Sequence, residues 1–221
     1  MMLKQIADVK FPTRWADFRL LAFEEVRGND KKMQEQPLQT ALALLLGDIH
    51  HSSPVVRIHS QCTTGDVFHS LRCDCHDQLH LALGVIAAEG AGILLYEQQE
   101  GRGIGLLEKL RAYELQDQGL DTIEANLRLG HAVDLRDYAL PVEILRFLGI
   151  RSVRLMTNNP DKIKAVRFSG IEIIGRLSAD VPGNSHSAHY LATKRERLGH
   201  LSRRTSEGTS PSRAVRAVAN E

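Results

Sequence analysis

The chain has 221 residues, of which 43% are hydrophobic and 25% are charged, a balance typical of a globular protein with a substantial core. A net charge of +1 gives no general attraction for nucleic acid or an anionic membrane, so an anionic ligand must be bound by a local group of basic side chains. No apolar run approaches the roughly 20 residues that span a bilayer, and residues 1–10 lack the apolar segment of a signal peptide. We therefore expect a cytoplasmic protein that binds a small molecule, with neither nucleic acid nor membrane as a partner.

The spacing of apolar residues predicts alternating strands and helices. Strands are expected over residues 18–23, 40–49, 54–59, 92–97, 152–156 and 171–174, the first three paired largely antiparallel. Helices are expected over residues 78–88, 106–118 and 141–148, and from the turn at 157–161 to near Gly170. This order indicates an α/β fold, in which a mixed sheet is layered with helices and the N-terminal antiparallel strands join the same core. The polar, aperiodic residues 201–221 are expected to form a disordered tail.

The cysteines of the chain are Cys62, Cys73 and Cys75, close together in the sequence. Three thiolates can hold zinc and leave one coordination position for water, which the metal makes more acidic. Cys73 and Cys75 would share a face of an extended segment, because side chains two residues apart point the same way. Buried cysteines also occur simply as small hydrophobic residues, but the polar neighbours here favour a metal site. A closed structural site remains open as an alternative, with His59, His69 or His76 as a fourth ligand.

A glycine-rich loop runs from Gly101 through Arg102 and Gly103 to Gly105, between an expected strand and an expected helix. Free backbone N–H groups at a helix start attract anions, which favours a phosphate-binding loop. The glycine spacing matches neither the dinucleotide fingerprint nor the Walker A motif. A tight turn with a solvated Arg102 is the simpler alternative.

Three further features have both a structural and a functional interpretation. The turn from Thr157 to Lys162 could bind phosphate or simply cap a helix through its Asn-Pro pair. Asp134 and Arg136 lie two residues apart, where a surface ion pair is the default. Tyr113 fits the apolar face of its helix and is by periodicity a core residue.

Taken together, these segments resemble the GTP cyclohydrolase II family in its stand-alone form, over nearly the whole chain to about Leu201. The segments that carry the resemblance are Arg57-Ile-His-Ser-Gln-Cys62-Thr-Thr-Gly-Asp, Leu71-Arg-Cys-Asp-Cys75, Gln99-Glu-Gly-Arg-Gly-Ile-Gly-Leu106, Leu110-Arg-Ala-Tyr113-Glu-Leu-Gln-Asp-Gln-Gly-Leu-Asp-Thr122, Asp134-Leu-Arg-Asp-Tyr138, Thr157-Asn-Asn-Pro160 and His189-Tyr-Leu-Ala-Thr-Lys194. The resemblance assigns residues 1–200 to one catalytic domain of this type. It also implies a homodimer.

The activity implied by the resemblance is the hydrolysis of GTP to 2,5-diamino-6-(5-phosphoribosylamino)pyrimidin-4-one, formate and pyrophosphate, for riboflavin or a related pathway. It implies one Zn²⁺ per subunit, held by Cys62, Cys73 and Cys75, and Mg²⁺ with the triphosphate. Tyr113 is implied to act near the zinc-bound water, Asp134 as proton acceptor and Arg136 as nucleophile. The positions implied to contact GTP are Arg57, Ile58, His59, Ser60, Gln61, Gln78, Glu100, Gly101, Arg102, Thr122, Thr157 and Lys162.

Arg136 is a weak candidate nucleophile, because a guanidinium stays protonated far above pH 7 and has no free lone pair. We expect it to stabilise charge on the transferring phosphoryl group instead. The chain departs from the family pattern at Gln61, where glutamate is usual, and at His76, where glycine is usual. These departures suggest either a specialised pathway or the alternative of a catalytically weakened GTP-binding sensor with structural zinc.

Overall fold

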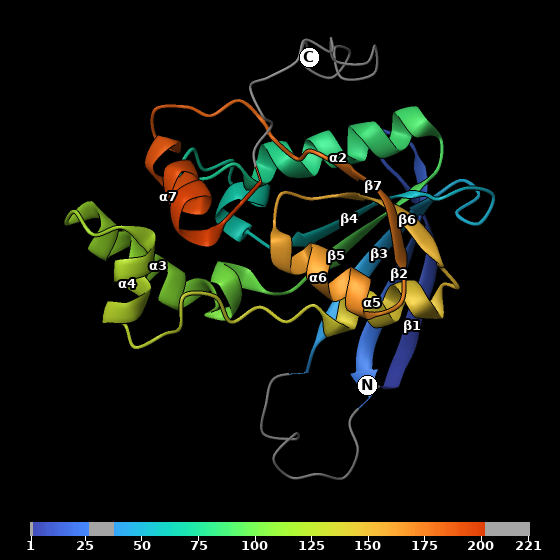
Figure 1. The fold of residues 1–221 in the computed structure, drawn as a ribbon, viewed down its shortest axis with the longest axis horizontal. Helices are drawn as coiled ribbons and strands as arrows, with labels where there is room; N and C mark the ends of the chain where they lie inside the picture. Colours follow the sequence, from blue (N-terminus) through green and yellow to red (C-terminus); the bar gives the residue numbers. More distant parts are fainter. Residues whose placement is uncertain (1, 27–37, 202–221) are drawn as a thin grey trace.

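The computed structural model describes residues 2–26 and 38–201, which form a mixed sheet flanked by helices (Figure 1). The strands in these residues are β1 (Met2–Pro12), β2 (Asp17–Val26), β3 (Thr40–Leu46), β4 (Val55–Ser60), β5 (Gly92–Glu97), β6 (Ser152–Met156) and β7 (Glu172–Leu177). The helices are α2 (Cys75–Glu89), α3 (Leu106–Asp117), α4 (Thr122–Arg128), α5 (Ala139–Phe147), α6 (Pro160–Phe168) and α7 (Ala188–Leu198). Two short helical turns, η1 (Thr63–Val67) and η2 (Glu100–Gly103), follow β4 and β5.

The strand order is β1-β2-β3-β5-β4-β6-β7, and the sheet changes from antiparallel to parallel within it. β1, β2, β3 and β5 pair antiparallel, whereas β4 pairs parallel with β5 and β6, and β6 pairs parallel with β7. The expected α/β fold with a mixed sheet and N-terminal antiparallel strands is confirmed. The expectation for residues 54–59 was wrong in one respect, because α2 crosses between β4 and β5 and such a crossover makes the two strands parallel.

Alternate residues of the central strands point to opposite faces of the sheet, and each face has its own apolar core. Ile93 and Leu95 pack in the cluster that contains α5 residues such as Ile144, while Leu94 between them packs in the cluster that contains Ile86 of α2. The helices α5 and α6 therefore cover one face and α2 the other. Strands buried on both faces have nearly continuous apolar sequences, as residues 92–96 do.

The carboxyl ends of β4, β5 and β6 lie at the same edge of the sheet, because these strands run parallel. The loops that begin after Ser60, Glu97 and Met156 therefore start side by side. Helices α3, α4 and α7 gather beyond this edge, at the left of Figure 1. Ligands of open α/β sheets bind outside the carboxyl ends of the parallel strands, so we expect a ligand-binding site at this edge.

Three elements in the described residues were not expected from the pattern: β1, α4 and α7. β1 is mostly exposed along one edge of the sheet and has little apolar alternation. The predicted tail lies outside the described residues from residue 202 onward. None of the helices in the described part of the chain combines the length and apolar character that a membrane crossing requires.

Glu97, at the end of β5, is a buried carboxyl group with 1% of its surface exposed. Its Oε1 accepts a hydrogen bond from the Gln99 side-chain amide at 3.0 Å. Burial raises the pKa of Glu97 to about 7, although the positive charges of Lys162 and Arg136 act to lower it. The folded protein therefore holds this proton more tightly than the unfolded chain does.

We predict that Glu97→Gln gains stability relative to the wild type as the pH rises. The folded pKa of about 7 exceeds the ordinary 4.5, so stability from this group is present below pH 4.5 and is lost as the pH rises through about 7. Between pH 5 and pH 8 the difference in unfolding free energy should change by roughly 2–3 kcal/mol in favour of the variant. Urea denaturation at several pH values measures it, with the exposed Glu172→Gln as control. A difference that is the same at every pH would contradict the prediction.

Candidate active site

A pocket opens where the loops after β4, β5 and β6 meet α3, α4 and α7. The residues predicted for the site that line the pocket are Arg57, His59, Ser60, Gln61, Cys62, Cys73, Cys75, Gln78, Glu100, Gly101, Arg102, Tyr113, Thr122, Arg136, Thr157 and Lys162. Segments separated by more than a hundred residues in the sequence are thus brought to one cavity.

Two of the predicted site residues do not line this pocket. Ile58 is fully buried in the core under α5 and α6, because its neighbours Arg57 and His59 point the other way along β4. Only the backbone of Ile58 is near the site, where its carbonyl accepts a hydrogen bond from Lys162 Nζ at 2.8 Å. Asp134 lines a neighbouring hollow and meets the main pocket through Arg136, which lines both.

The three cysteines place their sulfur atoms together, all within 4.8 Å of one another. The Sγ atoms of Cys62 and Cys73 are 3.7 Å apart. In the described part of the chain no other group of three or more potential metal ligands meets this criterion. A Cβ atom on Gly65 would lie 2.9 Å from Cys73 Sγ and 3.1 Å from Cys62 Sγ, so glycine leaves the sulfurs their space. Three converging thiols suit a metal better than a disulfide, which would pair only two of them.

The local conformation around Cys73 and Cys75 differs from the extended segment that was expected. Cys75 is the first residue of α2, and Asp74 precedes the helix as its N-cap residue. Asp74 accepts hydrogen bonds from Gln78 Nε2 and from Lys194 Nζ, each at 2.7 Å. The two sulfurs therefore converge because the chain turns into a helix between them.

None of the histidines considered as a fourth ligand contributes a nitrogen atom to the sulfur cluster. The His59 Nε2 atom lies 3.2 Å from Asp66 Oδ1. The other oxygen of this carboxylate, Oδ2, accepts hydrogen bonds from Tyr96 Oη at 2.8 Å and from the Cys62 backbone N–H at 2.9 Å. The rings of His69 and His76 contact each other, with centroids 3.8 Å apart and planes tilted by 36°. Asp66 thus fixes the start of the segment between β4 and α2 (residues 61–74), which we call the cysteine loop. His59 contacts the same Asp66 carboxylate.

The glycine-rich loop adopts a conformation that few residues tolerate. Gly101 and Arg102 both have a φ of 61°, which is strained for a side chain such as that of arginine. Both terminal nitrogens of the Arg102 guanidinium are buried without a hydrogen-bond partner. Unpartnered buried charge is costly, and it indicates a site that is completed by an anion. The simple turn with a solvated Arg102 is therefore excluded.

Glu100 and Lys109 connect the glycine-rich loop to the cysteine loop. Lys109 Nζ donates to Glu100 Oε1 at 2.6 Å and to Cys62 Sγ at 3.1 Å. The other Glu100 oxygen accepts from the Thr63 backbone N–H at 2.6 Å. Burial opposes the charge on Lys109, but the negative Cys62 and the Glu100 carboxylate raise its pKa above the usual value. The ammonium stays charged beside the sulfurs.

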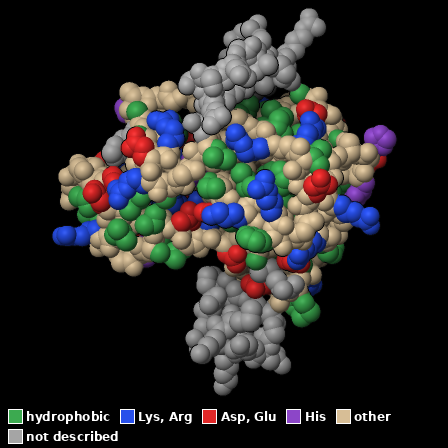
Figure 2. Space-filling model, in the orientation of Figure 1, with side chains coloured by type: hydrophobic (Ala, Val, Ile, Leu, Met, Phe, Trp, Pro, Cys, Tyr) green, Lys and Arg blue, Asp and Glu red, His purple; other side chains and the backbone are tan. Residues whose placement is uncertain are grey.

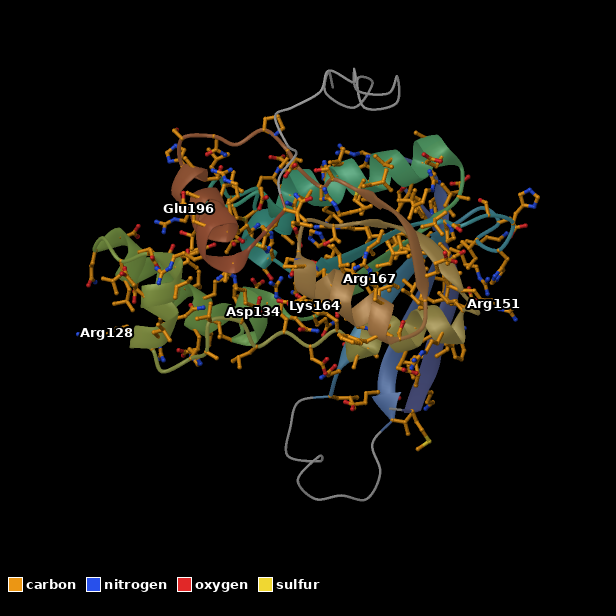
Figure 3. The ribbon with its side chains drawn as sticks, viewed as in Figure 1. Arg128, Asp134, Arg151, Lys164, Arg167 and Glu196 are labelled. Atoms are coloured by element: carbon orange, nitrogen blue, oxygen red, sulfur yellow. The ribbon has the colours of Figure 1, made fainter. Side chains whose placement is uncertain are left out.

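Asp134 and Arg136 form the expected ion pair, and it is more than a surface contact. Arg136 Nε donates to Asp134 Oδ1 at 2.9 Å, and only 13% of the Arg136 side chain is exposed. Burial raises the pKa of Asp134, but its hydrogen bonds from Arg136 outweigh this and hold the pKa below its usual value. Figure 3 labels Asp134 on the loop between the α3–α4 pair and α5. The Leu135 N–H donates to the Arg102 carbonyl at 2.9 Å, which joins this loop to the glycine-rich loop.

The turn after β6 is both a helix cap and part of the pocket. Asn159 accepts from the Asp161 backbone N–H at 2.8 Å and caps α6. Lys162, with 4% of its surface exposed, points back into the pocket, and burial lowers its pKa well below the ordinary value. An anion bound beside Lys162 would favour its charged form.

Sequence reasoning missed several pocket residues: Arg72, Lys109, Asn126, Tyr190, Lys194 and His200. Lys109 could have been found, because it lies four residues before Tyr113 and shares its helix face. Lys194 ends a segment that carries the family resemblance, but its place in the pocket depends on the packing of α7. On the face seen in Figure 2, acidic and basic side chains are interspersed.

Comparisons with known proteins agree with the resemblance seen in the sequence. The family model described as GTP cyclohydrolase II matches residues 4–178. The chain is 51% identical over 203 residues to "GTP cyclohydrolase-2" of Escherichia coli O45:K1 (strain S88 / ExPEC), covering 91% of this chain and 98% of that protein. It is 50% identical, with the same coverage, to the protein of the same name from Shigella boydii serotype 18.

One solved structure, a two-domain 3,4-dihydroxy-2-butanone 4-phosphate synthase from A. baumannii, matches with a TM-score of 0.41 and 18% identity. That match covers 79% of this chain and 40% of the other. The match to the family model and the two relatives determine the classification. The chain belongs to the GTP cyclohydrolase II family.

Proposed function

We propose that the chain hydrolyses GTP to 2,5-diamino-6-(5-phosphoribosylamino)pyrimidin-4-one, formate and pyrophosphate, the opening reaction of riboflavin synthesis or of a related pathway. The observation that carries the proposal is one pocket that holds three converging thiols at one side and the unpaired guanidinium of Arg102 at another. Membership of the family and relatives of 50% and 51% identity named GTP cyclohydrolase-2 support it.

We assign one zinc ion per subunit to Cys62, Cys73 and Cys75. Sulfur is a preferred donor for zinc, and three protein ligands leave a position for a reacting molecule. When bound, zinc supplies Lewis-acid activation of water for attack on the purine C8. Gly65 keeps the space between the sulfurs free, which fits an ion at this place.

Tyr113 is assigned to hold a proton close to the reacting purine. Its Oη lies 3.3 Å from Thr64 Oγ1, which lies 3.6 Å from Cys62 Sγ. Burial raises the pKa of Tyr113, so the phenol keeps its proton and acts as a hydrogen-bond donor. It can polarise the purine or orient the attacking water.

The phosphate chain is assigned to Arg102, Arg136 and Lys162, with Mg²⁺ bound to the triphosphate. These cations offset the charge that develops on the phosphoryl oxygens during cleavage. Asp134, kept ionised by Arg136, holds that guanidinium in place and can accept a proton. The other proposed GTP contacts are Arg57, His59, Ser60, Gln61, Gln78, Glu100, Gly101, Thr122, Thr157 and the backbone of Ile58.

Two expectations from the sequence stay predictions. Light scattering on the purified protein tests the homodimer, and the cytoplasmic location needs a test in cells. The assignment of residues 1–200 to one catalytic domain also stays a proposal. Truncation after residue 201 should leave GTP turnover intact if that boundary is right.

We predict that the wild type releases formate and pyrophosphate from GTP in the presence of Mg²⁺. Cys73→Ser should release formate at least about a hundredfold more slowly, because activation by the metal is worth several kcal/mol. Chelation should abolish formate release by the wild type, and added zinc should restore it. Added zinc should not restore the variant. A sensor, the alternative function, would bind GTP and release neither product.

We predict that Arg102→Met raises KM for GTP by about 10- to 150-fold, the value of one or two lost charge-assisted hydrogen bonds. Its stability without GTP should be unchanged or higher, because the terminal guanidinium nitrogens have no hydrogen-bond partners within the protein. Steady-state kinetics and urea denaturation measure the two effects. The control is Arg167→Met on α6, an exposed position labelled in Figure 3. A destabilised variant with an unchanged KM would contradict the assignment.

We predict that no covalent phosphoguanosine adduct forms on Arg136. Burial lowers its pKa, but the hydrogen bonds and charge of Asp134 outweigh this, so the guanidinium stays protonated. Mass spectrometry after an alkaline quench, which preserves phosphorus–nitrogen bonds, tests for the adduct. Arg136→Lys should keep more activity than Arg136→Met, which should lose about 100- to 1,000-fold in kcat. An adduct on Arg136 would establish the nucleophile instead.

A further inference from the structure

Lys109 has a place in the site that its sequence position does not reveal. It lies on α3, 12% of its side chain is exposed, and its Nζ is 3.1 Å from Cys62 Sγ. Among the described residues, it provides the only cationic hydrogen bond to a cysteine sulfur. The ammonium therefore faces the sulfur cluster directly.

Glu100 fixes the position of Lys109. The Glu100 carboxylate also accepts hydrogen bonds from two backbone N–H groups. Glu100 Oε1 accepts from Lys109 Nζ at 2.6 Å and from the Gly101 N–H at 3.1 Å, and Oε2 accepts from the Thr63 N–H. The ammonium thus contacts Cys62 and Glu100 at the same time. It is thus held at the sulfur by the same carboxylate that joins the two loops.

Three thiolates around a divalent cation carry a net charge of −1, and Cys62 and Cys73 are 5% and 7% exposed. A buried charge without compensation is unfavourable. A hydrogen bond from a cation to a thiolate also withdraws electron density from the sulfur, which makes it a weaker donor to a metal. Cys62 should thus differ from the other two ligands in donor strength.

We propose that Lys109 is a positioning residue of the metal site, which lowers the donor strength of Cys62 and stabilises the bound ion through its N–H···S hydrogen bond. The inference rests on the proposed zinc site and adds to it a residue that controls the electronic character of that site. A thiolate-rich site donates much charge to its metal, and Lys109 offsets part of it. The electrophilic character of the ion is thereby maintained.

The experiment compares Lys109→Met, which removes the charge at similar length, with Lys109→Gln, a neutral donor. The matched control is Lys164→Met on α6, where the side chain is 65% exposed and pairs with Asp161 outside the pocket (Figure 3). Each protein is prepared with Co²⁺ in place of zinc, and the sulfur-to-cobalt charge-transfer band is recorded. Zinc affinity is then measured by competition with a chromophoric chelator, without GTP.

We expect the charge-transfer band of Lys109→Met to move to lower energy and its zinc affinity to fall by about 10- to 100-fold, the usual effect of removing such a partner. Lys109→Gln should lie between this variant and the wild type, and Lys164→Met should match the wild type. If Lys109→Met does not fold by circular dichroism, Lys109→Gln carries the test with a smaller shift in the same direction.

An unchanged band and affinity in folded Lys109 variants would overturn the inference and leave Lys109 as a structural partner of Glu100. The proposed zinc site would survive that result. If the wild type itself shows no sulfur-to-cobalt band, the proposed site fails, and the inference fails with it. The two failures are therefore distinguishable.

Discussion

The parallel pairing of β4 with β5 and β6 is the constraint on which the site depends. Parallel strands end at the same edge of a sheet, so the cysteine loop, the glycine-rich loop and the turn before α6 must begin next to one another. The apolar clusters on both faces hold the strands in register. A change of register would turn Arg57 and His59 into the core and Ile58 into the pocket.

The pocket brings together basic side chains from several parts of the fold. Arg57 and Lys162 are almost completely buried, and Arg102 and Arg136 approach from the opposite loops. Gln78 accepts from Arg57 at 2.7 Å, and Asp134 pairs with Arg136, but Arg102 has no such partner. The fold thus maintains a local electrostatic imbalance that a polyanionic nucleotide would relieve, although the whole chain is nearly neutral.

Much of this arrangement could be predicted from the sequence where local pattern and tertiary environment agree. The strand at 92–97 and the helix beginning at Leu106 are both found, because a buried strand and a glycine-bounded helix have clear patterns. β1 was missed because an exposed edge strand needs no apolar alternation. The extended geometry expected for Cys73 and Cys75 was wrong, since Asp74 begins a helix between them. Grouping by motif brought Ile58 into the predicted site, whereas strand alternation places its side chain in the core.

Helix α7 completes the pocket from a part of the chain that lies beyond the matched family segment of residues 4–178. Its Lys194 pairs with Asp74, which lies 120 residues earlier between two of the cysteines. A ribosome makes the cysteine loop long before it makes the cation that neutralises Asp74. The lining of the cavity is therefore complete only after α7 has been synthesised, because Tyr190 and Lys194 belong to it.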